Sequence, residues 1–183
     1  MPAPPKRLYW DACSWIALIQ DETVSDADTG VMEHRGSMCR AVVAAAKKNI
    51  VELATSAFSL AEVCKRPPPG TPADAATLAA FFENSWVLNV SVDTYVGGLA
   101  RDLLLDGHPG LKPADAVHLA SALAARVEAF HTFDRRLLKL SGKIVALDGS
   151  PLLICKPEVP APPAPLLEEL KRDAGASLPG MRH

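Results

Sequence analysis

Four acidic residues stand where the sequence changes from a strand-like to a helix-like pattern: Asp11, Glu62, Asp115 and Asp134. If these carboxylates face one pocket, they cannot all stay ionised without a counter-charge, because each raises the pKa values of its neighbours. A hard divalent cation removes that conflict, and Mg²⁺ and Mn²⁺ prefer oxygen ligands. Such a metal can lower the pKa of a bound water and stabilise the charge that builds on a phosphodiester. The candidate chemistry is therefore hydrolysis of a nucleic-acid backbone.

Each acid also has a structural interpretation that requires no ligand. Asp11 and Asp134 are suited to cap the helices that follow them. Glu62 completes a Ser59-x-x-Glu62 capping box, and Asp115 lies in a first helical turn, where the helix dipole favours negative charge. Because α/β folds concentrate acids at this position for these reasons, the spacing alone leaves the function open.

The segment from 112 to 140 explains how two of the acids can meet. Apolar residues recur every three or four positions over 113–127, which predicts a helix roughly 20 Å long at ~1.5 Å per residue. Residues 128–133 are rich in aromatic residues and threonine, and they predict a strand that returns over a similar distance. Asp115 and Asp134 should therefore lie at one edge of a parallel sheet, where ligands bind.

Strand-like and helix-like segments alternate along the rest of the chain. Further strands are predicted at 6–10, 50–55, 86–92 and 143–147. Helices are predicted at 14–20, 31–49, 56–66, 71–84, 93–106 and 135–140, with a polar loop at 21–30. This alternation predicts an α/β fold with a mainly parallel central sheet covered by helices on both faces.

Length and composition set the domain organisation. With 183 residues, 49% of them hydrophobic, the chain can form one domain with a full core, and wholesale disorder is excluded. The apolar runs are too short to span a bilayer, and the first residues lack the apolar core of a signal peptide, so we expect a cytoplasmic protein without a membrane partner. Residues 1–155 form the predicted domain. Residues 156–183, rich in proline, form a tail that is expected to be disordered or to dock on a partner.

The distribution of charge permits local contacts with RNA. The net charge of −2 argues against a protein that is basic over its whole surface. Basic pairs nevertheless follow two of the acids, namely Lys65 with Arg66 after Glu62, and Arg135 with Arg136 after Asp134. These four cations are either part of a solvated surface or contacts for phosphates beside the cut site.

Four motifs in order along residues 8–148 also resemble a known family. They are an apolar strand that ends in Asp (LYWDACSW), a Ser-Leu-Ala-Glu helix (SLAEVCKR), the run PADAVHLASALA, and a Thr-x-Asp motif (HTFDRRLL). The chain resembles the PIN domain, and most closely the toxin subunit of VapBC-type toxin–antitoxin pairs. The third and fourth motifs are the specific part of this resemblance.

The resemblance implies a PIN-like three-layer α/β sandwich that acts as a metal-dependent endoribonuclease. It assigns the same four acids to a site around one or two Mg²⁺ or Mn²⁺ ions, with water as the nucleophile. Ser14 and Thr132 match the hydroxyl positions that support such sites. The implied partners are an RNA substrate, a small antitoxin protein and, in a homodimer, a second copy of the chain.

Two other functions stay open at this stage. A degenerate PIN-like module for protein interaction would have lost one or more acids, and none is missing. A magnesium-dependent phosphatase or phosphotransfer domain built around Asp11 would need a second Asp two residues later, where Cys13 stands. His118, one turn after Asp115, is interpreted as a histidine packed in the core, because sites of this type use oxygen ligands.

Overall fold

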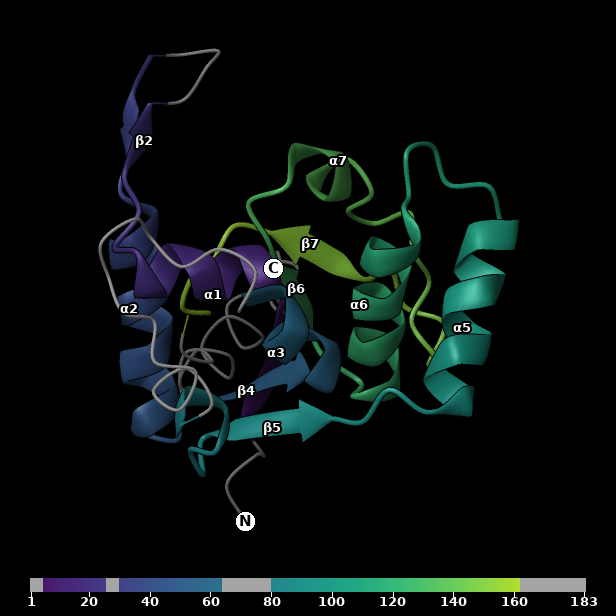
Figure 1. The fold of residues 1–183 in the computed structure, drawn as a ribbon, viewed down its shortest axis with the longest axis horizontal. Coiled ribbons are helices and arrows are strands. Elements are labelled where there is room, and N and C mark those ends of the chain that lie inside the picture. The colour runs from purple at the N-terminus through teal and green to yellow at the C-terminus, as the bar shows by residue number, and fades with distance from the viewer. Residues whose placement is uncertain (1–4, 26–29, 64–79, 162–183) are drawn as a thin grey trace, which may run out of the picture.

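The centre of the molecule is a five-stranded sheet in the order β5-β4-β1-β6-β7, and each neighbouring pair is parallel (Figure 1). The computed structural model describes residues 5–25, 30–63 and 80–161. The strands are β1 (Lys6–Trp10), β4 (Val51–Ser56), β5 (Val87–Val90), β6 (Ala129–His131) and β7 (Leu153–Cys155). The predicted parallel sheet is confirmed.

Alternate residues of the strands enter two separate hydrophobic cores. On β1, Leu8 and Trp10 belong to the first core, whereas Tyr9 belongs to the second. Tyr9 is in register with Phe130 of β6, and their rings stack with centroids 5.1 Å apart. Because both faces of the sheet are buried, the strands are almost continuously apolar, as expected for parallel strands between two helical layers.

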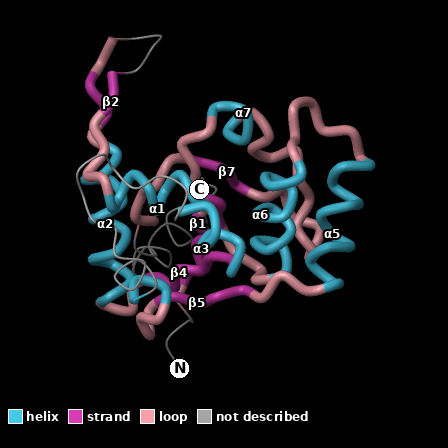
Figure 2. Tube along the Cα trace, viewed as in Figure 1, coloured by secondary structure: helices cyan, strands magenta, loops and turns pink. Residues whose placement is uncertain are grey.

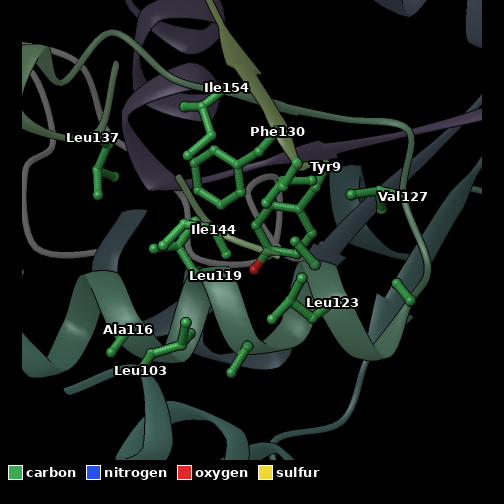
Figure 3. Packing of buried hydrophobic residues seen from close by; sticks show 14 of the residues in the cluster. Tyr9, Leu103, Ala116, Leu119, Leu123, Val127, Phe130, Leu137, Ile144 and Ile154 are labelled. Atoms are coloured by element: carbon green, nitrogen blue, oxygen red, sulfur yellow. The ribbon is translucent and has the colours of Figure 1, made fainter. Parts of the chain in front are cut away.

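Helices cover both faces of the sheet and complete three layers (Figure 2). The buried hydrophobic residues of α1 (Ala12–Ile19), α2 (Arg35–Lys47) and α3 (Ala57–Val63) belong to the first core. Those of α5 (Thr94–Leu105) and α6 (Pro113–Ala124) belong to the second. Figure 3 shows this second core, in which Leu119 and Leu123 of α6 lie against Tyr9 and Phe130. The short helix α7 (Arg135–Leu138) follows β6.

The predicted last strand at 143–147 is wrong. Ile144 is buried in the second core, but Val145 and Leu147 are exposed, and this segment forms turns with one isolated bridge. The reason is a tight turn: Asp148 accepts a hydrogen bond from the Ser150 backbone N–H, and Gly149 has φ 87°. The chain therefore reverses, and β7, after the turn, pairs with β6.

A two-stranded antiparallel hairpin occupies part of the expected loop at 21–30 and the start of the predicted helix at 31–49, and residues 26–29 of that loop lie outside the described residues. Its strands are β2 (Val24–Ser25) and β3 (Met32–Glu33), and α2 begins only at Arg35. Glu33 anchors the hairpin, because its carboxylate pairs with Arg35 at 2.8 Å and with Lys156 at 2.5 Å. Figure 1 shows the hairpin projecting away from the sheet.

Several sequence predictions fall outside the described residues. These are the start of the helix at 71–84, the cations Lys65 and Arg66, and the tail from 162 onward. In the part of the chain that is described, no helix combines the length and apolar character needed to cross a membrane.

Candidate active site

The four acids predicted from the sequence line one pocket of about 350 Å³. Asp11 follows β1, Asp134 precedes α7, and Asp115 lies in the first turn of α6. Glu62 is near the end of α3, and the remaining lining residues are Ala12, Cys13, Ile16, His118 and Leu137. Residues separated by more than 100 positions thus meet where two central strands end. A larger hollow of about 450 Å³, lined by the segments around Arg126 and Asp148, contains none of these acids.

Asp11 is held by hydrogen bonds at both carboxylate oxygens. Its Oδ1 accepts from the backbone N–H and the hydroxyl of Ser14, each at 3.1 Å. Its Oδ2 accepts from the Thr132 hydroxyl at 2.6 Å and from the Cys13 thiol at 3.0 Å. Burial and the nearby charge of Asp11 raise the pKa of Cys13, so the thiol keeps the proton that it donates. With a side chain that is almost fully buried, Asp11 has a fixed orientation.

The two hydroxyl residues join the strand ends to each other. The Ser14 hydroxyl also lies 3.1 Å from the backbone oxygen of His131, so its single proton is shared between this oxygen and Asp11, and it links α1 to β6. The Thr132 hydroxyl donates to Asp11 and accepts from the backbone N–H of Asp134 at 2.9 Å. Thr132 therefore connects the first and the last of the four acids directly.

Asp134 is paired with Arg136. It caps α7 by accepting from the Arg136 backbone N–H at 2.7 Å, and the guanidinium donates to both carboxylate oxygens, at 3.2 and 2.5 Å. Burial alone would raise the pKa of Asp134, but the hydrogen bonds from Arg136 hold it below its ordinary value. The same guanidinium lies 3.7 Å from Oδ2 of Asp115, so it partly neutralises two acids.

Asp115 has a buried carboxylate oxygen that receives no hydrogen bond from the described residues. Burial raises its pKa, Asp134 adds to the increase, and Arg136 opposes it. Its Oδ2 is buried, and no hydrogen-bond partner for this atom is found among the described residues. An unpaired buried carboxylate oxygen is costly, because it has lost water without gaining a donor. A cation in the pocket would supply the missing interaction.

Glu62 is held by His118. Its Oε2 lies 2.7 Å from Nε2 of His118, and the Tyr9 hydroxyl lies 2.9 Å from Nδ1 of the same ring. The predicted burial of His118 is confirmed, since the residue is 3% exposed, but the prediction missed its contact with Glu62. The sequence feature that could have indicated this contact is the spacing of three residues between Asp115 and His118, which places both side chains on one face of α6. The proposed capping box is wrong, because α3 begins at Ala57 and Ser59 is inside the helix.

The donor set suits a hard cation, although the site is not preassembled around one. Four carboxylates in one pocket are the ligands that Mg²⁺ and Mn²⁺ prefer. A cation there would also interact with Oδ2 of Asp115, which lacks a hydrogen-bond donor among the described residues. Within the described ranges, no three His, Cys, Asp or Glu side chains are grouped so as to hold a metal ion. A dication would compete with the Arg136 guanidinium for Asp134 and Asp115.

Two of the four predicted RNA-binding cations are described, and both lie on α7 beside the pocket. Arg135 and Arg136 are exposed. The guanidinium of Arg136 is turned toward Asp134, as given above, rather than away from the acids. Lys65 and Arg66 lie outside the described residues, so their positions relative to Glu62 stay a prediction.

Comparisons with known proteins agree with this architecture. The family model described as the PIN domain matches residues 8–143. Eleven chains of solved structures match, among them the crystal structure of Mycobacterium tuberculosis VapC20, which its authors describe as a Sarcin-Ricin loop cleaving toxin. That match has a TM-score of 0.52 and 18% sequence identity, and it covers 70% of this chain and 90% of the other. A comparison with the curated proteins gave no match.

Proposed function

We propose that this chain, which belongs to the PIN domain family, is a metal-dependent endoribonuclease that hydrolyses RNA phosphodiester bonds at the four-carboxylate pocket. The observation that carries the proposal is the convergence of Asp11, Glu62, Asp115 and Asp134 from separate elements onto one pocket. The buried Oδ2 of Asp115, which lacks a hydrogen-bond donor in the described residues, adds a specific need for a cation there. Structural caps alone would not require these four side chains to share a pocket.

The four acids are the proposed ligands of Mg²⁺ or Mn²⁺. When bound, the metal would lower the pKa of a water and stabilise the negative charge that develops on the scissile phosphate. Thr132 and Ser14 fix the orientation of Asp11, so less conformational freedom is lost when the site fills. The carboxylate oxygens therefore supply binding, and the hydroxyls supply preorganisation.

Arg135 and Arg136 are proposed to bind phosphates next to the cut site. Both are carried by α7, which begins directly after Asp134, so their side chains start at the edge of the pocket. Electrostatic contacts of this kind position a nucleic acid without reading its sequence. Lys65 and Arg66, which follow Glu62 by three and four residues in the sequence, are proposed to bind phosphates as well.

The proposal extends to the biological setting. The motif resemblance supports a toxin that acts in the cytoplasm and is held inactive by a small antitoxin protein, and a homodimer is the proposed assembly. The similarity to VapC20 adds support for the fold. A reading frame next to this gene that encodes a small protein with a DNA-binding head and an acidic, amphipathic tail is expected. If the product of that frame neither binds this chain nor suppresses its activity, the antitoxin part of the proposal fails.

Both rival functions fit the pocket less well. A protein-interaction module without catalysis gives no reason for four acids to line one pocket. A phosphatase centred on Asp11 would need a carboxylate at position 13, but Cys13 stands there and its thiol donates to Asp11. The nuclease therefore explains more of the observed contacts.

The decisive activity test compares wild type with Asp115→Asn on a circular RNA, which only an endonuclease can linearise. We expect cleavage by the wild type with added Mn²⁺ and no cleavage with a chelator. Asp115→Asn should lose about 100-fold or more, because even residues that only orient a metal ligand are typically worth 10- to 100-fold. Asp102→Asn, a matched change at an exposed site on α5, should keep the wild-type rate. Equal rates for wild type and Asp115→Asn would refute the proposal.

A further inference from the structure

We infer that His118 is a positioning residue, which holds Glu62 in the pocket through a hydrogen-bonded chain that begins at Tyr9. This inference rests on the proposed function, because it assumes that Glu62 binds a divalent cation. The chain connects three elements, since Tyr9 is on β1, His118 is on α6 and Glu62 is on α3. None of these contacts follows from the sequence motifs, which assign no functional role to His118.

The two hydrogen bonds of His118 define which ring nitrogen carries the proton. The Tyr9 hydroxyl lies 2.9 Å from Nδ1, and Glu62 Oε2 lies 2.7 Å from Nε2. An ionised Glu62 can only accept, so Nε2 must donate its proton to the carboxylate. In a neutral ring Nδ1 then accepts, and its donor is the Tyr9 hydroxyl. Glu62 thereby fixes the tautomer, and the Tyr9 hydroxyl supports it by donating to Nδ1.

The ring has little freedom to move. His118 is buried between Tyr9, with ring centroids 6.0 Å apart, and Phe58, with centroids 5.6 Å apart. The side chain of Glu62 is by contrast 24% exposed, so the carboxylate is still accessible from the pocket. A fixed donor thus holds one oxygen of a partly exposed carboxylate.

The helix that carries Glu62 has a separate anchor. The Ser59 hydroxyl lies 2.8 Å from the Thr55 hydroxyl, which donates to the backbone oxygen of Trp10 and accepts from the indole N–H of Trp15. Because Thr55 has already used its proton, Ser59 must be the donor. This network joins α3 to β4 without using His118. Loss of the histidine should therefore remove this hydrogen bond from Glu62 while α3 stays in place.

The benefit to metal binding is a smaller entropy cost. Glu62 has three rotatable side-chain bonds, and ordering such a side chain on binding is unfavourable. A residue that orients a metal ligand from outside the coordination sphere is typically worth 10- to 100-fold in metal affinity. We therefore expect His118→Leu to weaken Mn²⁺ binding about 10-fold. His118→Gln, whose amide can still donate to Glu62, should restore most of that affinity.

The test is a titration of the full chain with Mn²⁺, in which free Mn²⁺ is measured by its electron paramagnetic resonance signal. Tyr9→Phe removes only one hydroxyl, and it should weaken binding on the order of 3-fold, about one hydrogen bond. His131→Gln is the matched control, because His131 is also buried but its ring bonds to Trp10 at 3.2 Å and not to a pocket residue. This control should keep the wild-type affinity.

The outcomes separate the two claims. If wild type binds Mn²⁺, Asp115→Asn does not, and His118→Leu and Tyr9→Phe bind like wild type, the positioning inference is overturned and the nuclease proposal stands. If wild type fails to bind Mn²⁺ at all, both are overturned. Should His118→Leu fail to fold, Tyr9→Phe decides the matter, because it preserves the shape of the buried ring.

Discussion

Replacing Thr132 with valine should damage both the stability and the metal affinity of this protein. Thr132 is fully buried, and its hydroxyl donates to Asp11 at 2.6 Å while accepting from the Asp134 backbone N–H at 2.9 Å. Valine has nearly the same shape, so the change removes these two hydrogen bonds without creating a cavity. It leaves a buried carboxylate oxygen and a backbone N–H short of one partner each.

The expected cost follows from these two contacts. A hydrogen bond to a charged group contributes about 1.5 to 3 kcal/mol, and an unpaired buried N–H costs roughly 1 to 3 kcal/mol. Because Asp11 keeps its bonds from Ser14 and Cys13, we expect the lower part of the combined range, about 2.5 to 4 kcal/mol of unfolding free energy. The Mn²⁺ affinity should fall about 10-fold, because Asp11 and Asp134 both lose the same support.

Urea unfolding of the metal-free protein measures the first effect, and Mn²⁺ titration measures the second. Thr23→Val is the matched control, since Thr23 is exposed and its hydroxyl is 3.4 Å from His34. This control should change the unfolding free energy by less than about 0.5 kcal/mol. If Thr132→Val is as stable as the control and binds Mn²⁺ equally well, the reasoning about the hydroxyl bridge is wrong.

Two further predictions concern acid stability and RNA contact. Burial lowers the pKa of His131 to about 4, so the unfolded state binds more protons between pH 6.5 and 4, and stability is lost as the pH falls through that interval. Between pH 7 and pH 5 the loss of unfolding free energy amounts to about 2 kcal/mol, which urea unfolding at the two pH values measures. His131→Gln should remove this part of the pH dependence. An unchanged pH dependence in the variant would contradict the assignment of the effect to His131. Arg135→Ala should weaken RNA binding and lower the slope of log affinity against log salt by about 1, and an unchanged slope in a salt titration would count against the phosphate contact.

The sheet and the meeting of the acids could be predicted because local patterns determine them. Asp115 lies in the first turn of α6, and Asp134 follows the next strand, β6. Because a helix that leads into a parallel strand runs back along the sheet, its first turn and the end of that strand lie at the same edge, and so do the two acids. Asp11 is placed by the same rule, since it directly follows the central strand β1. These positions depend on chain direction and on element lengths, which a single sequence contains.

The remaining features depend on contacts between distant residues. The hairpin of β2 and β3 is held by the ion pairs of Glu33 with Arg35 and Lys156. No alternation of apolar and polar residues in this segment predicts it. The last strand was misplaced because 143–147 and 153–155 are both apolar, and only the Asp148 turn decides which one pairs with β6. The contact between Glu62 and His118 likewise requires knowing that α3 and α6 meet at the pocket.

The central claim is that the four acids share a divalent cation, and anomalous diffraction from crystals containing Mn²⁺ tests it most directly. We predict one or two manganese peaks in the pocket, within coordination distance of Asp115 Oδ2 and of at least one oxygen from Asp11, Glu62 or Asp134. Displacement of the Arg136 guanidinium from Asp134 should accompany the peak. A pocket without manganese at a concentration that saturates RNA cleavage, with Arg136 still bound to Asp134, would contradict the account.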